Sequence, residues 1–447
     1  MRIHLSEHFT YKKLLRFVFP SVVMMIFTSI YSVVDGLFVS RFVGKSAFAA
    51  INLVSPILAI LGTFGTMLGT GGAAIVGKTL GEFEKEKNSK ANEYFSMLIY
   101  AVIVIGVLFG IIGFLFIPDI IGILGAKESM KADCLLYGRV ILCALPFFIL
   151  SYAFQSFFAT AEKPQIGLAV TVLGGIGNIL LDALFILVFK QGVFGAALAT
   201  ALSQTLCGIL EILYFSRKND SLLQLTIGIK FRKEVLFKAC FNGLSEMVGN
   251  MASSVVAMVY NYQLLKYIGE NGVAAYGVIE YIGFIFSAIF IGYTMGIAPA
   301  VSYQYGADCH DELKNICKKS LFIIGVTGGL MVICAWGLSG TIAGIFVGYD
   351  KELYRLTMHA ISIYMISFLF SGYSIFGSAF FTALNNGVMS ATISFVRTFI
   401  FEIGCVLILP AIIGVDGIWS AIVVAEVAAL CMTLIIFIAN RKRYQYI

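Results

Sequence analysis

Twelve stretches of this chain are each long and apolar enough to cross a lipid bilayer as a helix. Such a helix needs about 20 predominantly apolar residues. Of the 447 residues, 59% are hydrophobic and only 13% are charged, which a soluble protein could not bury. We therefore predict an all-α polytopic membrane protein with the lipid bilayer as its partner. The expected spans are residues 14–38, 50–77, 94–117, 135–160, 166–189, 193–215, 236–263, 273–303, 320–347, 354–384, 388–412 and 417–439.

The distribution of Lys and Arg indicates how these spans are oriented. The loops on the side of the N-terminus, which include the charged segment 78–93, hold more than twice as many Lys and Arg as those on the other side. The positive-inside rule then places both termini in the cytoplasm and the protein in the cell membrane. Residues 1–17 lack the short apolar core and cleavage site of a signal peptide, so we interpret them as a cytoplasmic lead-in.

Several other classes of protein fit the sequence poorly. The net charge of +6 comes from residues in loops between apolar spans, which argues against a nucleic-acid partner. Nine Cys without a CxxC motif and four His without metal-ligand spacing predict no disulfide framework, metal site or cofactor. The sequence has no Walker, HExxH or GxSxG motif, so we expect no ATP site and no enzyme. Any pumping must then draw on an ion gradient.

The two halves of the chain repeat each other. The matched segments, in order, are 43–54 with 268–279, Gly71 with Gly296, Gly81 with Gly306, Phe157-Phe158 with Phe380-Phe381, and 192–195 with 414–417. Six spans per half is an even number, so both halves have the same orientation. This predicts two six-helix bundles related by a pseudo-two-fold along the membrane normal, with a substrate path between them. We place the N-lobe at 1–215, a cytoplasmic linker at 216–235 and the C-lobe at 236–447.

Ionisable and polar side chains inside the spans of the first half are candidates for a functional site. Asp35 lies in the first span, where a carboxylate costs several kcal/mol unless it faces a protein interior, a wet cavity or the headgroup region. Asn178 and Asp182 share one face of the fifth span, and Thr200 follows in the sixth. Their oxygens could bind Na⁺, or the two carboxylates could share a proton, because two adjacent like charges resist full ionisation. Interhelical hydrogen bonding is the structural alternative for Asn178 and Thr200.

The second half does not duplicate this acidic set. The repeat places Tyr260 opposite Asp35, and only Glu402 falls close to the position matching Asp182. Arg397 and Glu402 are about 140° apart around a helix, so we expect each to have its partner on another helix. Glu246 and Glu280 either line a cavity that attracts a cationic solute or sit in water at helix ends. Glu211, late in the sixth span, is expected to reach the cytoplasmic interface.

These features together resemble the multidrug and toxic compound extrusion (MATE) transporters. The resemblance rests on the twelve repeated spans, Pro20 fifteen residues before Asp35, the N-x-x-x-D of Asn178 and Asp182, and GxxGAAxAT ending at Thr200. It covers essentially the whole chain. In that family an antiporter exports amphipathic, often cationic drugs in exchange for Na⁺ or H⁺. The resemblance implies that Asp35, Asn178, Asp182 and Thr200 form a cation-coupling site and that Pro20 permits a bend.

One departure from the family pattern concerns the second half. Some members carry acidic residues on both the seventh and tenth spans, and Glu246 supplies the seventh here, but residues 354–384 contain no Asp or Glu. The hypothesis is a monomeric secondary active exporter that works by alternating access, with Na⁺ or H⁺ left open as the coupling ion. The alternative is a flippase for a lipid-linked or polysaccharide precursor from the same superfamily. Mainly acidic intramembrane residues favour cationic cargo over phosphates.

Overall fold

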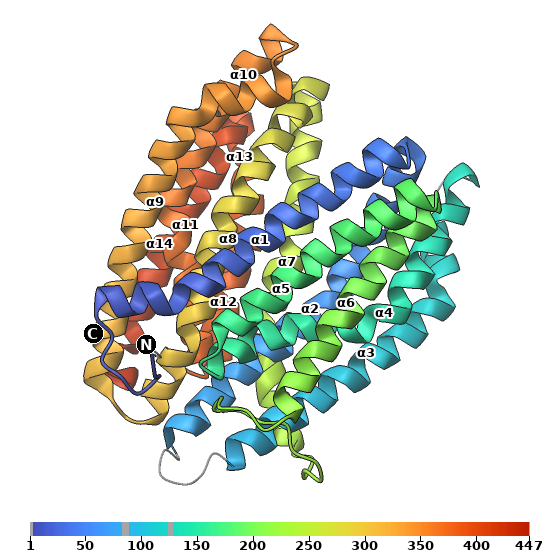
Figure 1. The fold of residues 1–447 in the computed structure, drawn as a ribbon. Helices are drawn as coiled ribbons and strands as arrows, with labels where there is room; N and C mark the ends of the chain where they lie inside the picture. The colour runs from blue at the N-terminus through green and yellow to red at the C-terminus, as the bar shows by residue number, and fades with distance from the viewer. Residues whose placement is uncertain (1–2, 83–88, 124–127, 447) are drawn as a thin grey trace.

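All regular structure in the described part of the chain is helical. The computed structural model describes residues 3–82, 89–123 and 128–446, and within these ranges long helices lie side by side (Figure 1). The two termini lie near one end of the molecule, called here the terminal end, and α10 begins at the opposite, far end. The prediction of an all-α protein is confirmed.

Among the described residues, twelve long helical segments correspond to the twelve predicted spans, with ends that differ by ten residues or fewer. Three of them are joined from shorter pieces: α5–η1, α10–η2–α11 and α12–η3–α13. The bounds are α1 (Tyr11–Phe42), α2 (Lys45–Glu82), α3 (Ser89–Ile123), α4 (Glu128–Thr160), α5 (Pro164–Asp182), η1 (Ala183–Val188), α6 (Gly192–Ser216), α7 (Lys233–Tyr267), α8 (Glu270–Gly306), α9 (His310–Val347), α10 (Lys351–Tyr364), η2 (Met365–Ser367), α11 (Phe368–Ala383), α12 (Gly387–Phe395), η3 (Val396–Glu402), α13 (Ile403–Ile413) and α14 (Val415–Tyr444).

Eleven of the segments are apolar enough to cross a membrane on length and composition alone, and α7 is the exception among the described residues. The polar residues of α7 bond to neighbouring helices. Gln263 Nε2 donates to the carbonyl of Val406, and Asn242 Nδ2 donates to Asn385 Oδ1. A spanning helix tolerates such side chains when other helices satisfy them.

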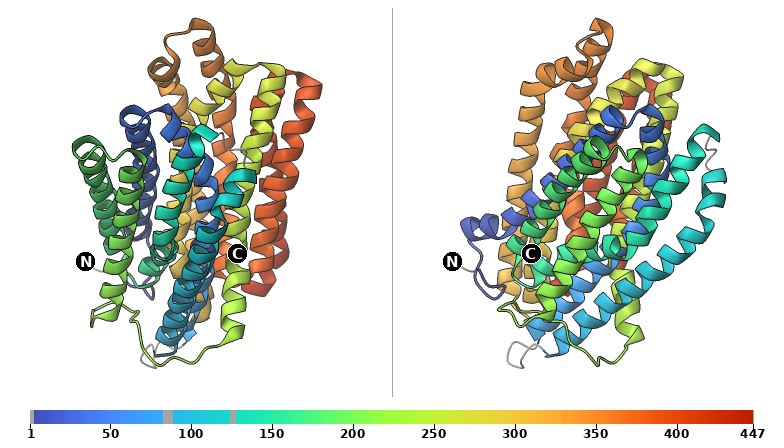
Figure 2. Two further views of the ribbon diagram at one scale, coloured as in Figure 1. Left: turned by 90° about the vertical axis from the view of Figure 1, so that its right-hand side faces the viewer. Right: turned by 45° about the vertical axis from the view of Figure 1, so that its right-hand side comes forward.

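Backbone conformation supports the internal repeat at the turns between helices. A left-handed φ is rare for residues other than glycine, so its recurrence at matched positions is informative. The matched pairs are Gly44 (φ 124°) with Gly269 (86°), Glu162 (57°) with Asn385 (59°), and Gly192 (58°) with Gly414 (69°). The fifth and eleventh spans also each contain a π-helical segment, η1 and η3. The chain therefore forms two similar bundles, α1–α6 and α7–α14, and both views in Figure 2 show them side by side.

The two bundles touch mainly through α1 and α2 of the first and α7 and α8 of the second, with smaller contacts of α4 with α8 and of α2 with α11. Glycines allow the backbones to approach closely, as small residues do in membrane helices. A Cβ added to Gly292 of α8 would lie 2.6 Å from Val22 Cα of α1, and one on Gly71 of α2 would lie 2.6 Å from the Gly243 nitrogen of α7. A Cβ on Gly81 of α2 would likewise overlap the Tyr303 carbonyl of α8. These approaches involve the segments of α1, α2, α7 and α8 nearer the terminal end, so the bundles are packed together there.

The connection between the bundles runs along the first one before α7 begins. Gln224 N–H donates to Asn92 Oδ1 over 2.9 Å, and Thr226 N–H donates to Ser96 Oγ over 2.9 Å, so this segment is docked on α3. The lobe limits of 1–215 and 236–447 and the linker 216–235 stay predictions.

Candidate functional site

Asp35 of α1 faces into the first bundle. Its carboxyl group lies close enough to that of Asp182 for the two to interact electrostatically. Two adjacent carboxylates resist full ionisation, so a proton or a cation between them would be favourable. The Oδ1 atoms of Asp35 and Asp182 are both buried, and neither has a hydrogen-bond partner within the described ranges. The Asp35 side chain is therefore partly enclosed by protein, and its place in a cation-coupling site stays a prediction.

The fifth helix positions Asp182 at the point where its winding changes. α5 ends at Asp182 and the π-helical η1 begins at Ala183. Such segments within α-helices occur often at functional sites, because they redirect the side chains beside them. Asp182 is only 1% exposed and Asn178, one turn earlier on the same face, is fully buried.

Asn178 links Asp182 to the sixth helix. With its amide NH₂ turned toward Asp182, Nδ2 donates to Asp182 Oδ2 over 3.2 Å, and the Thr200 N–H donates to the amide oxygen over 3.2 Å. In the opposite orientation, Nδ2 lies 3.3 Å from Thr200 Oγ1. In the first orientation both the NH₂ group and the oxygen of the Asn178 amide have a hydrogen-bond partner, as is usual for a buried amide. Asp35, Asn178, Asp182 and Thr200 thus come together from α1, α5 and α6.

This arrangement suits a small cation. Two carboxyl groups with unpartnered buried oxygens lie beside an amide oxygen and a hydroxyl, which are the hard ligands that Na⁺ takes and also the acceptors that hold a proton. Within the described ranges, no group of three or more His, Cys, Asp and Glu could hold a metal ion.

Two tyrosines near the pair were not singled out from the sequence. Tyr31, one turn before Asp35 on α1, and Tyr137 of α4 both interact electrostatically with Asp35 and Asp182. Gly175 of α5 lies beside this part of α1, because a Cβ there would be 2.6 Å from the Phe27 ring and 3.5 Å from the Tyr31 ring. The i, i+4 spacing of Tyr31 and Asp35 is the signal that could have identified the first, since it puts both on one helix face.

Pro20 lies inside α1, nine residues after its start. Proline has no N–H to donate to the carbonyl four residues earlier, so the helix is weakened there. Ser21 and Val22, which follow it, contact Gly292 of α8 in the other bundle. The helix nevertheless runs without interruption to Phe42. The bend implied for Pro20 stays a prediction.

In the second bundle, Arg397 pairs with Glu426 of α14 and not with Glu402. Its Nη2 lies 2.6 Å and its Nε 2.9 Å from Glu426 Oε1, and Glu426 is 1% exposed. The expectation that Arg397 has its partner on another helix is therefore met. Glu402 closes the π-helical η3, so its local setting parallels that of Asp182 beside η1.

The position matching Asp35 belongs to an aromatic cluster. The rings of Tyr260 and Tyr276 stack with centroids 4.9 Å apart, and Tyr364 lies 6.3 Å from each. Glu280 is partly buried and lies one turn after Tyr276 on α8, close enough to interact with it. Protein therefore surrounds part of Glu280, which lies ten residues into α8, and its role in a cavity stays a prediction.

Glu246 and Glu211 are two further carboxylates within the helices, and the sequence-based expectation for Glu211 is not met. Glu246 of α7 is partly buried, next to Ser245, whose hydroxyl accepts from Ser390 Oγ over 2.7 Å. Glu211 was expected at the interface, and that expectation is wrong. Its side chain is buried, and it accepts a 3.1 Å hydrogen bond from Ser151 of α4. The α4–α6 contact covers it, which span position alone does not reveal.

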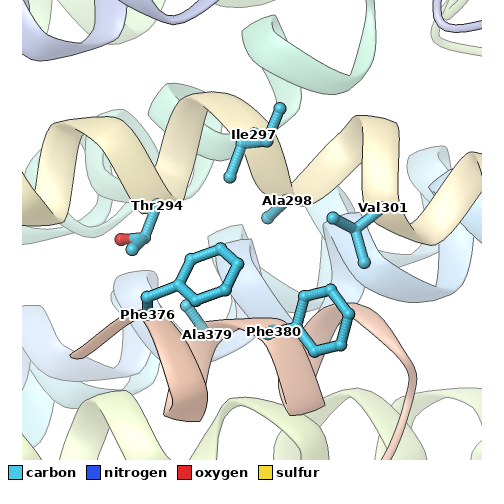
Figure 3. A pocket seen from close by; sticks show the side chains of 7 residues that line it. All are labelled: Thr294, Ile297, Ala298, Val301, Phe376, Ala379 and Phe380. Carbon is cyan, nitrogen blue, oxygen red and sulfur yellow. The ribbon is translucent and has the colours of Figure 1, made fainter. Parts of the chain in front are cut away.

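A small apolar gap lies within the second bundle, between α8 and α11. Figure 3 shows Phe376 and Phe380 facing Ile297 and Val301 across it. Its empty volume is about 150 Å³. This volume includes space open to solvent, and none of the residues that line the gap is charged.

Comparison with known proteins identifies the family that the chain matches and solved structures that share its fold. A family model described as MatE matches residues 20–184 and 247–407. The chain is 25% identical over 439 residues to the multidrug export protein MepA of Staphylococcus saprophyticus, covering 97% of this chain and 94% of that protein. It is 26% identical over 435 residues to MepA of Staphylococcus aureus, with the same coverage. A solved outward-facing multidrug resistance MATE transporter of the MOP superfamily matches with a TM-score of 0.91 at 21% identity, covering 99% of this chain and 97% of that one.

Proposed function

The chain belongs to the MatE family, and on that premise we propose that it is a secondary active multidrug exporter. In this proposal it moves amphipathic, mostly cationic compounds out of the cell in exchange for H⁺ or Na⁺. The multidrug export proteins named above support the cargo class. The observation that carries the proposal is the buried Asp35–Asp182 pair, whose unpartnered oxygens suit a coupling ion.

The proposed mechanism is alternating access controlled by the occupancy of this pair. With a proton or Na⁺ bound, the repulsion between the two carboxylates is relieved and α1 and α5 can stay together. With both carboxylates charged and empty, that contact is unfavourable. Drug and ion then exchange because each prefers a different state of the transporter, and they need not share a site.

Each first-bundle residue has a distinct part in this proposal. Asp35 and Asp182 bind the ion. Asn178 holds Asp182 in place and joins it to Thr200, whose hydroxyl is a further ligand for Na⁺. Pro20 lets α1 bend where it contacts α8.

The second bundle contributes a separate charged region. Glu246, Glu280 and Glu402 are partly buried carboxylates, and Arg397 is neutralised by Glu426. Counting Arg397 and Glu426 as neutral leaves excess negative charge, which attracts a cationic drug. We propose that these residues favour cationic cargo without binding the coupling ion.

The proposed setting is the cell membrane, with the terminal end and both chain termini in the cytoplasm. The excess of Lys and Arg in the loops at that end supports the orientation. We propose a monomer in which residues 1–215 and 236–447 form the two lobes and residues 216–235 link them.

Transport by the purified protein in liposomes tests the proposal and identifies the ion. A fluorescent cationic drug is supplied under an imposed Na⁺ gradient, under an imposed pH gradient, or under neither. Drug movement that follows one gradient and stops when it is collapsed is the expected result. Movement that ignores both gradients would refute coupled antiport.

A further inference from the structure

The segment before α1, residues 3–10, is called here the N-terminal strap. It crosses from one bundle to the other at the terminal end. It has no regular structure, yet Leu5 and Phe9 are both fully buried. An irregular segment with buried side chains must have its backbone groups bonded to other parts of the protein. Those bonds go to both bundles.

Glu162 anchors the strap to the first bundle. This residue sits in the turn between α4 and α5 with a left-handed φ of 57°, and its side chain is only 3% exposed. Its Oε1 accepts the Leu5 N–H over 2.7 Å, and its Oε2 lies 2.9 Å from His4 Nδ1. A carboxylate bonded to a backbone N–H in a buried setting is among the stronger hydrogen bonds in a protein.

Four residues of α8 and α9 anchor the strap to the second bundle. Gln304 Nε2 donates to the Leu5 carbonyl over 2.7 Å. The Phe9 N–H donates to Glu312 Oε1 over 2.8 Å, and Asn315 and Lys319 donate to the Phe9 carbonyl over 2.9 and 2.6 Å. Leu5 is therefore bonded to the first bundle through its N–H and to the second through its carbonyl.

The strap repeats an arrangement found in the other half of the chain. The connection before α7 docks on α3 of the first bundle, through the bonds of Gln224 and Thr226 described above. The strap before α1 docks on α9 of the second bundle. In each half, the segment ahead of the first helix thus lies on the third helix of the other bundle. The connection before α7 is also joined to the first bundle through the chain, because it follows α6. The strap has no such link to the second bundle, and only non-covalent contacts hold it there.

We propose that the N-terminal strap is a latch that stabilises the state in which the bundles are packed together at the terminal end. Glu162, Gln304 and Glu312 are its positioning residues. The inference rests on the proposed function only in requiring that the bundles separate at that end during transport.

The geometry explains why the latch must open. Separation moves α2 away from α8, which now approach closely enough that a Cβ on Gly77 would overlap the Ser302 hydroxyl. Leu5 cannot stay bonded to Glu162 and Gln304 once their bundles part. Asn385, which matches Glu162 in the repeat, donates to the Ala74 carbonyl of the other bundle over 3.1 Å. That hydrogen bond must also break when the bundles separate. The strap adds to this barrier against opening.

The test is a double variant, Glu162→Asn with Glu312→Ala, which removes from each bundle the carboxylate that accepts a backbone N–H of the strap. Asn accepts a left-handed φ and already occupies the matching turn as Asn385, but it is one methylene shorter and cannot reach Leu5. Asp311→Ala is the matched control. It removes an exposed carboxylate next to Glu312, in the same first turn of α9.

Hydrogen exchange of the full-length protein in lipid nanodiscs, without drug or gradient, reports on the latch. The double variant is expected to exchange about tenfold faster than wild type in residues 67–82 and 292–306, which corresponds to about 1.4 kcal/mol. Asp311→Ala is expected to match wild type. Unchanged exchange in the double variant would overturn the proposal.

A second, milder variant tests the proposal in case the double variant misfolds. Gln304→Ala removes a single donor on α8 and is expected to speed exchange in the same segments, by a smaller factor. A change spread evenly over all helices in both variants would also count against a latch. Because exchange is read without transport, failure of the latch is distinguishable from failure of drug antiport, which the liposome assay reports.

Discussion

The glycine contact between α2 and α7 gives the sharpest prediction about bundle packing. Replacing Gly243 with Ala places a Cβ that overlaps the Met67 carbonyl oxygen and lies 2.6 Å from its carbon and 2.9 Å from Met67 Cα. These are backbone atoms, which cannot swing aside as a side chain can. α7 and α2 must therefore separate by about 1 Å to restore ordinary contact.

The cost follows from the size of this overlap. Inserting a methyl group into a well-packed contact costs about 1–3 kcal/mol. Because the strain exists only while the bundles are packed at the terminal end, this energy shifts the balance toward the open state by about 5- to 150-fold. Gly249→Ala is the matched control, since it lies on the same helix with no heavy atom within 4 Å of its added Cβ.

Hydrogen exchange measures the shift directly, because exchange through a rare opening rises in proportion to the open population. Gly243→Ala is expected to exchange at least about fivefold faster than wild type in residues 67–82. Gly249→Ala is expected to exchange as wild type or slightly more slowly, because Ala favours the helix. Equal exchange in both variants would show that this contact does not hold the bundles together.

Two further substitutions, one in each bundle, test the contacts in the bundle interiors. Glu426→Gln leaves the partly buried Arg397 guanidinium beside a neutral partner, and breaking a buried pair costs about 3 kcal/mol. We expect a melting temperature several degrees below wild type, and a value equal to wild type would contradict a structural role for the pair. Asn178→Ala removes the donor to Asp182 and leaves the Thr200 N–H unpaired, so ion-driven export is expected to fall about tenfold or more. Gly177→Ala, whose added Cβ has no atom within 4 Å, is the control, and equal losses in the two variants would show that the amide bonds do not matter.

Most of the architecture could be predicted because apolar length and internal repetition are properties of the sequence. All twelve predicted spans correspond to helical segments, including α7, which a hydropathy threshold misses. That span, residues 236–263, was predicted from its own run of apolar residues. The same repeat matched Glu162 with Asn385, although only the structure shows that both adopt a left-handed φ.

Less of the candidate site could be predicted from the sequence, since its geometry depends on how the helices are rotated and on their local winding. Asp35 and Asp182 were found as charges in apolar spans, but their mutual contact depends on how α1 packs on α5. Glu211 was misplaced because span position says nothing about α4 covering it. The N-terminal strap has no periodic pattern at all, and its role depends on partners about 150 and 300 positions away.

The central claim is that Asp35 and Asp182 couple an ion gradient to drug export. The most direct test is gradient-driven export in liposomes by Asp35→Asn combined with Asp182→Asn, at matched protein content. Asp416→Asn, which removes an exposed carboxylate of α14, is the control. The double variant is expected to lose export driven by either ion while the control keeps it. Unimpaired gradient-driven export by the double variant would contradict the account.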